Sequence, residues 1–403
     1  MTDTRSVVGY HDAFKTLCDR RLIQSMYDEC DELMERVLLT LHGQEHTERR
    51  AIELKLFRRD FVHYYERQVY PITLDKILKP YLTQGRMDLP LFGKQVNINL
   101  SADIAGIDLP EESLELTNLL ISIVTKFGEG ATLFHSTRDK SEVRKEVAEA
   151  LAKFDTYFFQ PSFLRRQQLL RDIVAGDRSE LGMPRDILST LLEKRDSHEL
   201  DEAMIRREVA FFMQAGSHSS AVAMVHAFHD IETWCEKNSD DASRVRQDDL
   251  FLQRCVHESL RLHPASPVAW RKAECPFTLA NGEFVEQNGS VVINLKNSNQ
   301  DGEVFGDDPS GFNPYRKVAS RVAPYGLTFG VGLHTCFGRE LAGGSLPGNV
   351  KDLSKHHLGT ITSLLKSLYR HNVKRDPDNA PTTDRDTIRR NWATYPVCIG
   401  KPD

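Results

Sequence analysis

The sequence of 403 residues is long enough for two or three domains, although single domains of this size exist. Its composition is ordinary for a soluble globular protein, with 40% hydrophobic residues, 27% charged residues and a formal net charge of -6. Because there is no strong basic excess, nucleic acid is not expected to be the main partner.

The seven cysteines are scattered along the chain without a CxxC pair. An odd, unpatterned set in a chain of this length indicates a reducing compartment and not a disulfide framework. The first residues are polar and lack the apolar core of a signal peptide. No apolar run approaches the ~20 residues that a membrane span requires. We therefore expect a cytoplasmic protein with no membrane attachment.

The first part of the chain alternates short elements with polar joints. Residues 7–18 look like the end of a strand followed by a short helix. Residues 19–42 carry apolar side chains in a partly helical rhythm, which fits either a lid over a binding site or plain core packing. A strongly basic helix is predicted to open at His46 and to run through Arg58 and Arg59.

Amphipathic helices are predicted for the middle of the chain. Apolar residues recur at helical spacing over residues 61–78, 114–127 and 143–159. Pro161 and Gly176 are predicted to separate such helices. No internal repeat, low-complexity tract or linker interrupts the sequence, so we expect one domain over residues 1–403.

The longest continuous helix is predicted over residues 201–237, with Asp201 as its N-terminal cap. A later helix ends at Pro264 and carries Glu258 and Arg261, which are three residues apart and can form a pair on one face. Residues 277–295, with turn signals at Asn-Gly pairs, predict a small β region.

One cysteine lies in a glycine-spaced turn, in the stretch Phe329-Gly330-Val331-Gly332-Leu333-His334-Thr335-Cys336-Phe337-Gly338. Gly330 and Gly332 allow backbone angles that a residue with a Cβ would resist. Residues 339–342 read as the start of a helix, whose N-terminus favours thiolate over thiol. A thiolate presented from a rigid loop is what a haem iron needs as its proximal ligand.

This stretch resembles the haem-binding signature of the cytochromes P450, Phe-Gly-x-Gly-x-His-x-Cys-x-Gly, at every fixed position. The resemblance covers about residues 7–399 and points to the soluble bacterial type. It implies a mainly α fold with a small β region and one haem b, with Cys336 as the iron ligand. The implied reaction inserts one oxygen atom from dioxygen into an organic substrate. The family's first helix and strand have no counterpart here, so this piece is either naturally absent or trimmed.

The resemblance also implies which residues surround the haem. Besides Cys336, the cofactor-binding residues would be Phe329, Gly330, His46, Arg50, Arg271 and His334, the basic ones on the propionate side. Glu258, Arg261 and Arg316 would form a buried ion triad that fixes the loop carrying the cysteine.

In the family, the long central helix crosses the distal haem face with the motif Ala-Gly-x-acid-Thr-Thr. Ala215 and Gly216 match this motif, but His218 stands where the acid is usual and Ser219 where the threonine is usual. Ser219 keeps the hydroxyl, and His218, with an unperturbed pKa near ~6.5, could relay protons. His218 as a surface or salt-bridged histidine, or as a sixth iron ligand, are the alternatives.

The residues that the resemblance places beside the substrate suggest a small, largely apolar molecule. They are Phe211, Phe212, Pro267, Val268, Ala269 and Trp392.

A second departure follows Cys336, where Gly343-Gly344 and Pro347-Gly348 should break the family's proximal helix. The insertion at about residues 343–356 would contact a partner or be a passive surface excursion. Electrons would come from a ferredoxin or flavoprotein, which we expect to dock on basic residues. These residues are Arg49, Arg58, Arg59 and Arg339.

Two alternatives stay open. A haem-thiolate peroxygenase, or an enzyme of oxidative coupling or desaturation, would tolerate altered residues at His218 and Ser219. A non-catalytic haem-binding protein would keep Cys336 but would not turn over.

Overall fold

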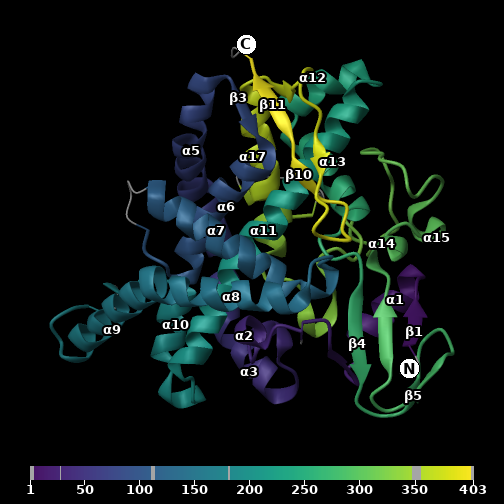
Figure 1. The fold of residues 1–403 in the computed structure, drawn as a ribbon. Helices are drawn as coiled ribbons and strands as arrows, with labels where there is room; N and C mark the ends of the chain where they lie inside the picture. Colours follow the sequence, from purple (N-terminus) through teal and green to yellow (C-terminus); the bar gives the residue numbers. More distant parts are fainter. Residues whose placement is uncertain (1–3, 28, 110–113, 180–181, 347–354, 401–403) are drawn as a thin grey trace.

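The computed structural model describes residues 4–27, 29–109, 114–179, 182–346 and 355–400, and most of them are helical (Figure 1). The 34-residue helix α11 (Glu202–Cys235) runs through the centre of the molecule and is surrounded by other helices. The strands form small sheets of two to four strands. The predicted mainly α fold with a small β region is confirmed.

Ten α-helices are described before α11 and six after it. Those before it are α1 (Tyr10–Cys18), α2 (Asp31–Met34), α3 (Gly43–Glu53), α4 (Arg59–Tyr64), α5 (Tyr70–Gln84), α6 (Leu89–Ala105), α7 (Leu114–Ala131), α8 (Lys140–Phe154), α9 (Gln160–Val174) and α10 (Ile187–Glu193). Those after it are α12 (Ser239–Gln247), α13 (Asp249–Leu262), α14 (Leu295–Ser298), α15 (Gly302–Phe305), α16 (Arg339–Gly343) and α17 (Thr360–Arg370). Short 3-10 turns are η1 (Leu38–Thr40), η2 (Leu54–Phe57), η4 (Leu133–His135), η7 (Asp196–His198) and η8 (Gly332–His334).

Two π turns each connect two consecutive helices. The turn η3 (Tyr65–Val69) connects α4 to α5, and η5 (Asp155–Phe159) connects α8 to α9. The prediction that Pro161 separates two helices is therefore wrong. Pro161 lies in the first turn of α9, directly after the π turn, where a proline needs no N–H and its fixed φ suits a helix.

The sheets bring together segments that are far apart in the sequence. The largest has the strand order β1 (Thr4–Val7), β7 (Ser290–Ile293), β4 (Ala269–Ala273) and β2 (Leu22–Gln24), with only the β1–β7 pair parallel. A second has the order β3 (Arg86–Asp88), β11 (Pro396–Ile399) and β8 (Val373–Arg375). Two hairpin-like pairs are β5 (Phe277–Thr278) with β6 (Phe284–Val285), and β9 (Thr382–Thr383) with β10 (Trp392–Thr394).

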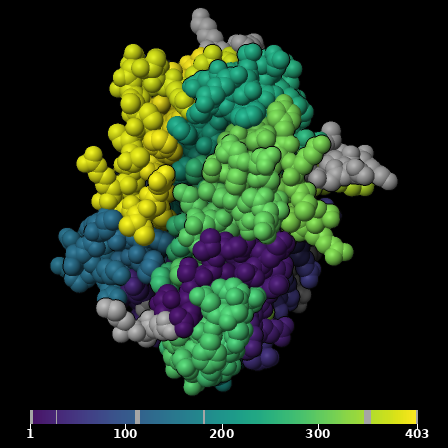
Figure 2. Space-filling view, turned by 90° about the vertical axis from the view of Figure 1, so that its right-hand side faces the viewer, coloured from purple at the N-terminus to yellow at the C-terminus, as the bar shows by residue number. Residues whose placement is uncertain are grey.

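The N-terminal segment completes the β region. Strand β1 and helix α1 pack against β7 and α14, and Figure 2 shows this purple segment lying against the green residues of the β region. Together they form a second hydrophobic core, separate from the one that surrounds α11. The predicted turns of this region are present, with Gly282 at φ +86° and Asn288 at φ +64°.

Helix α11 is capped as predicted and is held closely against α6. The Asp201 carboxylate accepts a hydrogen bond from the Met204 N–H over 2.7 Å. A Cβ at Gly93 of α6 would lie 2.8 Å from the Met224 side chain, and a Cβ at Gly216 of α11 would lie 2.6 Å from Ser101 Oγ. Because both glycines are required for this close approach, α6 fixes the position of the middle of α11.

The predicted break after Cys336 is present. Helix α16 ends at Gly343, and Gly344 (φ +77°) turns the chain away from it. The chain returns at Gly359, where a Cβ would lie only 2.5 Å from the Gly344 nitrogen. The buried Gln253 side chain ties both ends together by donating to the carbonyls of Gly343 and His357. The predicted partner contact of this insertion falls largely on residues 347–354, outside the described residues.

Within the described ranges, no helix is both long and apolar enough to cross a membrane. All seven cysteines are free thiols, in agreement with the absence of a disulfide framework from the sequence pattern.

Candidate functional site

Cys336 is presented by a tight loop that precedes α16. Gly330 (φ +64°) and Gly332 (φ +75°) both adopt the left-handed conformation that favours glycine. A Cβ at Gly332 would also lie 3.1 Å from the Leu17 carbonyl of the neighbouring helix α1. The Cys336 N–H donates to the Phe329 carbonyl over 2.9 Å and closes the loop. The sulfur is therefore held on a rigid backbone, as the glycine spacing predicts.

The surroundings of the Cys336 thiol act on its pKa in opposite directions. Cys336 has exposed surface, but the surrounding protein shields the thiol from bulk water. This burial raises the pKa of the Cys336 thiol. The backbone N–H groups of Gly338 and Arg339 and the charges of Arg50 and Arg339 lower it. The N-terminus of α16 contributes in the predicted direction, but the net pKa of the free thiol is raised because desolvation is the larger effect. Binding to a metal would be needed to make it a thiolate near neutral pH.

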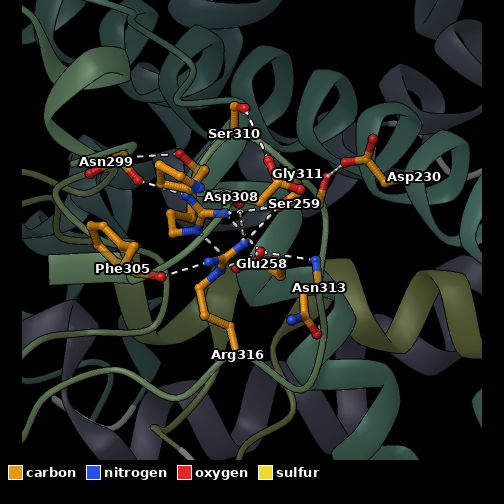
Figure 3. Close-up of polar contacts among 12 residues, drawn as sticks. Asp230, Glu258, Ser259, Asn299, Phe305, Asp308, Ser310, Gly311, Asn313 and Arg316 are labelled. Carbon is orange, nitrogen blue, oxygen red and sulfur yellow. Dashed lines mark hydrogen bonds and ion pairs between the residues drawn. The ribbon is translucent and has the colours of Figure 1, made fainter. Parts of the chain in front are cut away.

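Glu258, Arg261 and Arg316 form an ion triad, and Figure 3 shows the polar contacts of Glu258 and Arg316. The Glu258 carboxylate accepts from the Arg261 guanidinium at 2.7 and 2.8 Å and from Arg316 Nε at 2.9 Å. All three side chains are buried. The remaining donors of the two arginines go to backbone carbonyls, among them those of Phe305 and Gly311 for Arg316. The carboxylate is thus shared between two guanidinium groups, as the motif order predicts.

Asn299 links the triad to the cysteine loop. Its side-chain amide donates to the Arg261 carbonyl over 3.1 Å and to Thr328 Oγ1 over 3.1 Å, and its oxygen accepts from the Leu327 N–H over 2.6 Å. Leu327 and Thr328 directly precede Phe329, the first residue of the loop. The position of the thiol is therefore coupled to the triad by hydrogen bonds through a fully buried asparagine. No sequence pattern had identified Asn299.

Four basic residues gather near the loop from three parts of the chain: His46, Arg50, Arg271 and His334. The His46 and His334 rings lie 4.6 Å apart, and His46 Nε2 is buried without a hydrogen-bond partner in the described structure. Arg50 donates to the Thr335 carbonyl over 2.7 Å and lies 4.3 Å from the Phe337 ring. We call these four residues the basic set.

The basic set lacks acidic partners. Burial and the charges of Arg271, His46 and Arg50 lower the pKa of His334 to about 3, and burial lowers the pKa of Arg271 to about 10. Within the described ranges, no carboxylate forms an ion pair with any of the four. Arg50 and Arg271 remain cations near neutral pH, and buried cations of this kind require compensating anions. The basic set therefore suits a ligand that carries carboxylates close to the thiol.

The middle of α11 borders open space. Gly216 is exposed although its neighbours Gln214 and Ser217 are buried. Ser219 Oγ donates to the Ala215 carbonyl over 2.8 Å, so its proton is directed to the helix backbone. The predicted distal residues Ala215, Gly216 and Ser219 thus lie together at this position of the helix.

His218 is not a surface histidine. Its ring packs against α7, where a Cβ at Gly128 would lie 3.3 Å from His218 Cγ, and its Nε2 is buried without a partner in the described structure. Burial, together with the charges of Arg389 and Lys94, lowers the pKa of His218 to about 3. The ring is therefore neutral near pH 7, in contrast to the ordinary pKa assumed from sequence, because it is desolvated and faces cations. Lys94 of α6, which the sequence analysis missed, lines the same small cavity of about 10 Å³.

The predicted substrate-side residues do not all face one space. Phe211 and Phe212 are buried neighbours in α11, and Phe212 lies 6.4 Å, ring to ring, from Phe337 beside the thiol. Pro267 and Val268 are half-buried in the segment before β4. The Ala269 side chain, however, belongs to the second hydrophobic core.

Trp392 lies elsewhere than the resemblance implied. Its ring packs 4.9 Å from the His229 ring and 5.3 Å from the Tyr395 ring. His229 lies roughly four turns after Gly216, about 20 Å along the helix. The residue of the same C-terminal segment that reaches the end of α7 is Arg389, whose side chain contacts Thr132. A pair of adjacent arginines, Arg389 and Arg390, was the signal available in the sequence.

One predicted docking residue is buried. Arg49 is 3% exposed and its Nη1 lies 3.0 Å from the Glu208 carboxylate of α11. The prediction that Arg49 contributes to a surface for an electron donor is wrong, because the buried Glu208 requires a counter-charge and Arg49 supplies it. Arg58 and Arg59 are exposed, and Arg339 is half-buried.

A second buried carboxylate, that of Glu53, also interacts with the charge of Arg49. Neither oxygen of Glu53 has a hydrogen-bond partner among the described residues, and burial, followed by the charge of Glu208, raises the pKa of Glu53. Burial raises the pKa of Glu208 to about 7. Carboxyl groups with raised pKa values contribute stability that is present at low pH and lost as the pH rises through those values.

We therefore expect Glu53→Gln to stabilise the protein at pH 8 and to have little effect at pH 5. Since one pKa unit corresponds to about 1.4 kcal/mol, the gain at pH 8 should be about 1–3 kcal/mol. Urea unfolding of the wild type and the variant at both pH values measures this. Glu48→Gln, on the exposed face of the same helix, is the control and should leave the free energy of unfolding unchanged at both pH values. An equal effect of Glu53→Gln at pH 5 and pH 8 would contradict the assignment.

The fold and this site define a helical protein that presents one thiol beside a cluster of unpaired basic residues. Residues 108–345, more than half of the chain, match the model of the family Cytochrome P450. The chain belongs to the cytochrome P450 family.

Similar proteins agree with this assignment. Cytochrome P450 137 of Mycobacterium tuberculosis is 26% identical over 250 residues, which are 59% of this chain and 49% of that protein. Pulcherriminic acid synthase of Bacillus subtilis is 22% identical over 348 residues, which are 84% of this chain and 77% of that protein. The chain thus spans about half the length of the first of these relatives.

Solved structures share the fold at low identity. The crystal structure of CalO2 has a TM-score of 0.73 and 18% identity, and covers 98% of this chain and 90% of its own. P450BioI, solved with an acyl carrier protein that carries hexadec-9Z-enoic acid, has a TM-score of 0.73 and 16% identity, and covers 98% and 92%.

Members of this family bind haem through a cysteine thiolate. The residues present here fit that cofactor. Cys336 is an exposed residue on a rigid loop, and the basic set provides two guanidinium groups without acidic ion-pair partners among the described residues, Arg50 and Arg271, for the two propionates of haem b. The unpartnered Nε2 of His46 is one of the groups that such a carboxylate would satisfy.

Proposed function

We propose that the protein is a haem-dependent monooxygenase that inserts one oxygen atom from dioxygen into a small organic substrate. The observation that carries this proposal is the Cys336 loop, with its glycine geometry, its coupling to the ion triad and the neighbouring basic set. When bound, haem with a thiolate ligand supplies the iron and the electron density that favour cleavage of dioxygen. The chain's task is to hold the cofactor, exclude water and orient the substrate.

Proton delivery on the distal side would involve Ser219 and His218. The Ser219 hydroxyl donates to Ala215 in the structure and must rotate away from the helix backbone to serve a substrate-side acceptor. His218 is neutral near pH 7, so it can pass a proton between its two ring nitrogens but cannot act as a stored charge. Lys94, beside the same small cavity, is the nearest cationic group that could supply a proton.

Replacing His218 with aspartate tests this role. Aspartate restores the acid usual in the family and would face Lys94 and Arg389, which act on the pKa of residue 218 in the structure. We expect His218→Asp to change, by at least about threefold, the fraction of electrons lost as hydrogen peroxide, because general acid–base groups contribute about 10²- to 10⁴-fold to rates. Peroxide formed per NADH consumed is the measurement, with a substrate identified by spectral titration. An unchanged fraction would exclude a relay through residue 218.

We further propose that a ferredoxin or flavoprotein supplies the electrons and docks near Arg58, Arg59 and Arg339. The two exposed arginines start α4, and Arg59 acts on the pKa values of His356 and His357 at the returning end of the insertion. Arg339 acts on the pKa of the Cys336 thiol. A basic surface so close to the cysteine loop would steer an acidic donor to it.

Reversing the charge of this surface tests the docking proposal. We expect Arg58→Glu with Arg59→Glu to slow reduction by a ferredoxin about tenfold or more at low salt, with a smaller difference at high salt, because steering is screened by ions. Stopped-flow reduction at two ionic strengths measures this. The matched control is Arg171→Glu with Arg178→Glu, two exposed arginines in the last turn of α9 and shortly after it, which should leave the rate unchanged.

A second candidate function is a haem-thiolate enzyme driven by peroxide or one that catalyses coupling or desaturation. The neutral, unpartnered His218 favours it, because such enzymes depend less on the usual acid and threonine. A non-catalytic haem-binding protein is the third.

One set of measurements distinguishes these functions. The visible spectrum of the reduced protein with carbon monoxide tests for thiolate-ligated haem, and a long-wavelength band is expected. Product formation with reduced ferredoxin supports the monooxygenase, and product formation only with peroxide supports the second candidate. The absence of product under both conditions supports the third. A carbonyl band typical of histidine ligation would contradict all assignments that use Cys336.

A further inference from the structure

A half-buried guanidinium ties together three segments around the distal side of the molecule. Arg389, in the loop before β10, donates through Nη2 to Thr132 Oγ1 over 3.0 Å and through Nη1 to the Ala265 carbonyl over 3.3 Å. Its Nε lies 3.4 Å from Thr387 Oγ1. Thr132 follows α7, and Ala265 lies between α13 and β4. All three acceptors are neutral oxygens.

Some N–H donors of the Arg389 side chain have no acceptor among the described residues. Each terminal nitrogen of the guanidinium keeps one further N–H without an acceptor in the described part of the chain. The Thr132 hydroxyl donates its own proton to the Gly128 carbonyl over 2.7 Å, so its role as an acceptor from Arg389 is fixed. Burial lowers the pKa of Arg389, and no ion pair joins it to a described carboxylate; Asp384 acts on it only from a greater distance.

The surroundings of Arg389 are rich in basic groups. Its charge lowers the pKa values of His218 and His135, and Lys94 also lowers that of His218. Lys94 has no ion pair in the described structure either, although Asp384 and Asp88 offset part of its charge from a distance. His135 Nδ1 and His218 Nε2 are buried without partners there. The local potential is therefore positive and would attract an anion.

Tyr27 lies within electrostatic reach of both Arg389 and the cysteine loop. Arg271 and Arg389 lower the pKa of Tyr27, whereas burial and Cys336 raise it, so one side chain is within electrostatic reach of all three. Tyr27 also lines a cavity of about 360 Å³ formed by the segment from Tyr27 to Glu45. Arg389 lies in a different segment from the four residues of the basic set, and its side-chain hydrogen bonds go to Thr132, Ala265 and Thr387 instead of to the cysteine loop.

We propose that Arg389 binds a carboxylate of the substrate, so that the substrate is an organic acid with an otherwise apolar body. This inference rests on the proposed haem enzyme and names its substrate class. The two unused N–H groups of Arg389 donate to the carboxylate, and the neutral oxygens of Thr132, Ala265 and Thr387 hold the guanidinium in place. Anchoring one end of the molecule in this way leaves its apolar part to lie towards Phe211 and the cysteine loop, and so determines which carbon is presented for reaction.

The test compares acids with their own methyl esters, which keep the apolar body but remove the charge. Dodecanoic acid, 4-phenylbutyric acid and N-acetylphenylalanine, each with its methyl ester, are titrated into the holoprotein by isothermal calorimetry. We expect at least one acid to bind about tenfold to a hundredfold more tightly than its ester, as charge-assisted hydrogen bonds typically give. Arg389→Gln should abolish that preference. Arg389→Lys, which keeps the charge but loses the fork, should retain part of it.

The controls separate a binding role from a purely structural tie. Arg390→Gln changes the exposed neighbouring arginine and should keep the full preference. Thr132→Val removes the hydrogen bond between Arg389 and Thr132 but keeps the charge of Arg389. It should lower the melting temperature and keep most of the preference for the acid over its ester. If Arg389→Gln lowers only the melting temperature, or if every acid binds no better than its ester to the wild type, Arg389 is a structural tie and the proposal is overturned. Calorimetry requires no turnover, so a failure of the proposed oxygenase activity would be seen separately, in the carbonyl spectrum and product assays.

Discussion

Cys336→Ser will remove the long-wavelength carbonyl band completely and abolish substrate oxidation. The reason is that the loop offers the iron one sulfur, held by the Cys336 N–H bond to the Phe329 carbonyl and by the left-handed glycines Gly330 and Gly332. A serine hydroxyl has the same reach but does not form the electron-rich ligand that favours oxygen cleavage. The reduced carbonyl spectrum and product formation measure the two losses.

A matched control is available in the same chain. Cys275→Ser changes an exposed cysteine between β4 and β5 and should leave the band and the activity unaltered. The melting temperature of the haem-free Cys336→Ser protein should remain close to that of the wild type, because the side chain borders open space and fills no core. A variant that keeps the long-wavelength band would show that another residue ligates the iron.

The sequence was sufficient to predict the cysteine loop, the long helix and the Glu258–Arg261 pair, because these features depend on local spacing. Gly330 and Gly332 are two residues apart in one turn, and Glu258 and Arg261 are three residues apart on one helix face. Such relations can be predicted without knowledge of tertiary contacts. The matching of Arg316 to the triad needed the resemblance to a family, since no local rule pairs positions that are 55 residues or more apart.

Other features could not be predicted because they depend on contacts between distant segments. Arg49 lies in a basic run and looks solvated, but Glu208, 159 positions later, draws it into the core. His218 has an ordinary environment in the sequence, whereas burial against Gly128 of α7, with Lys94 and Arg389 nearby, makes it neutral. Pro161 looks like a helix breaker and is accommodated by a preceding π turn. For Arg49 and His218 the tertiary partner decides the role of the residue, whereas for Pro161 the adjacent π turn does.

Arg261→Met will lower the free energy of unfolding by about 3–5 kcal/mol, because it removes one of the two guanidinium groups that compensate the buried Glu258 carboxylate and leaves Arg316 as the only remaining arginine of the triad. Arg261 is fully buried, and its guanidinium donates to Glu258 and to the carbonyls of Asn299 and Pro309. A loss of this size is a large part of a typical stability of about 5–15 kcal/mol. Because Asn299 connects the Arg261 backbone to Leu327 and Thr328, the cysteine loop should lose its rigidity as well.

The two consequences can be measured in one urea titration that follows both the haem absorbance and the far-ultraviolet circular dichroism. In the wild type we expect the two signals to change together. In Arg261→Met the haem signal should be lost at lower urea than the helical signal, since the loop loosens before the helices around α11 unfold. Arg254→Met, on the exposed face of the same helix, removes an equal charge without touching Glu258 and should shift neither transition. Coincident transitions in Arg261→Met, at the wild-type midpoint, would show that the triad neither stabilises the fold nor holds the loop.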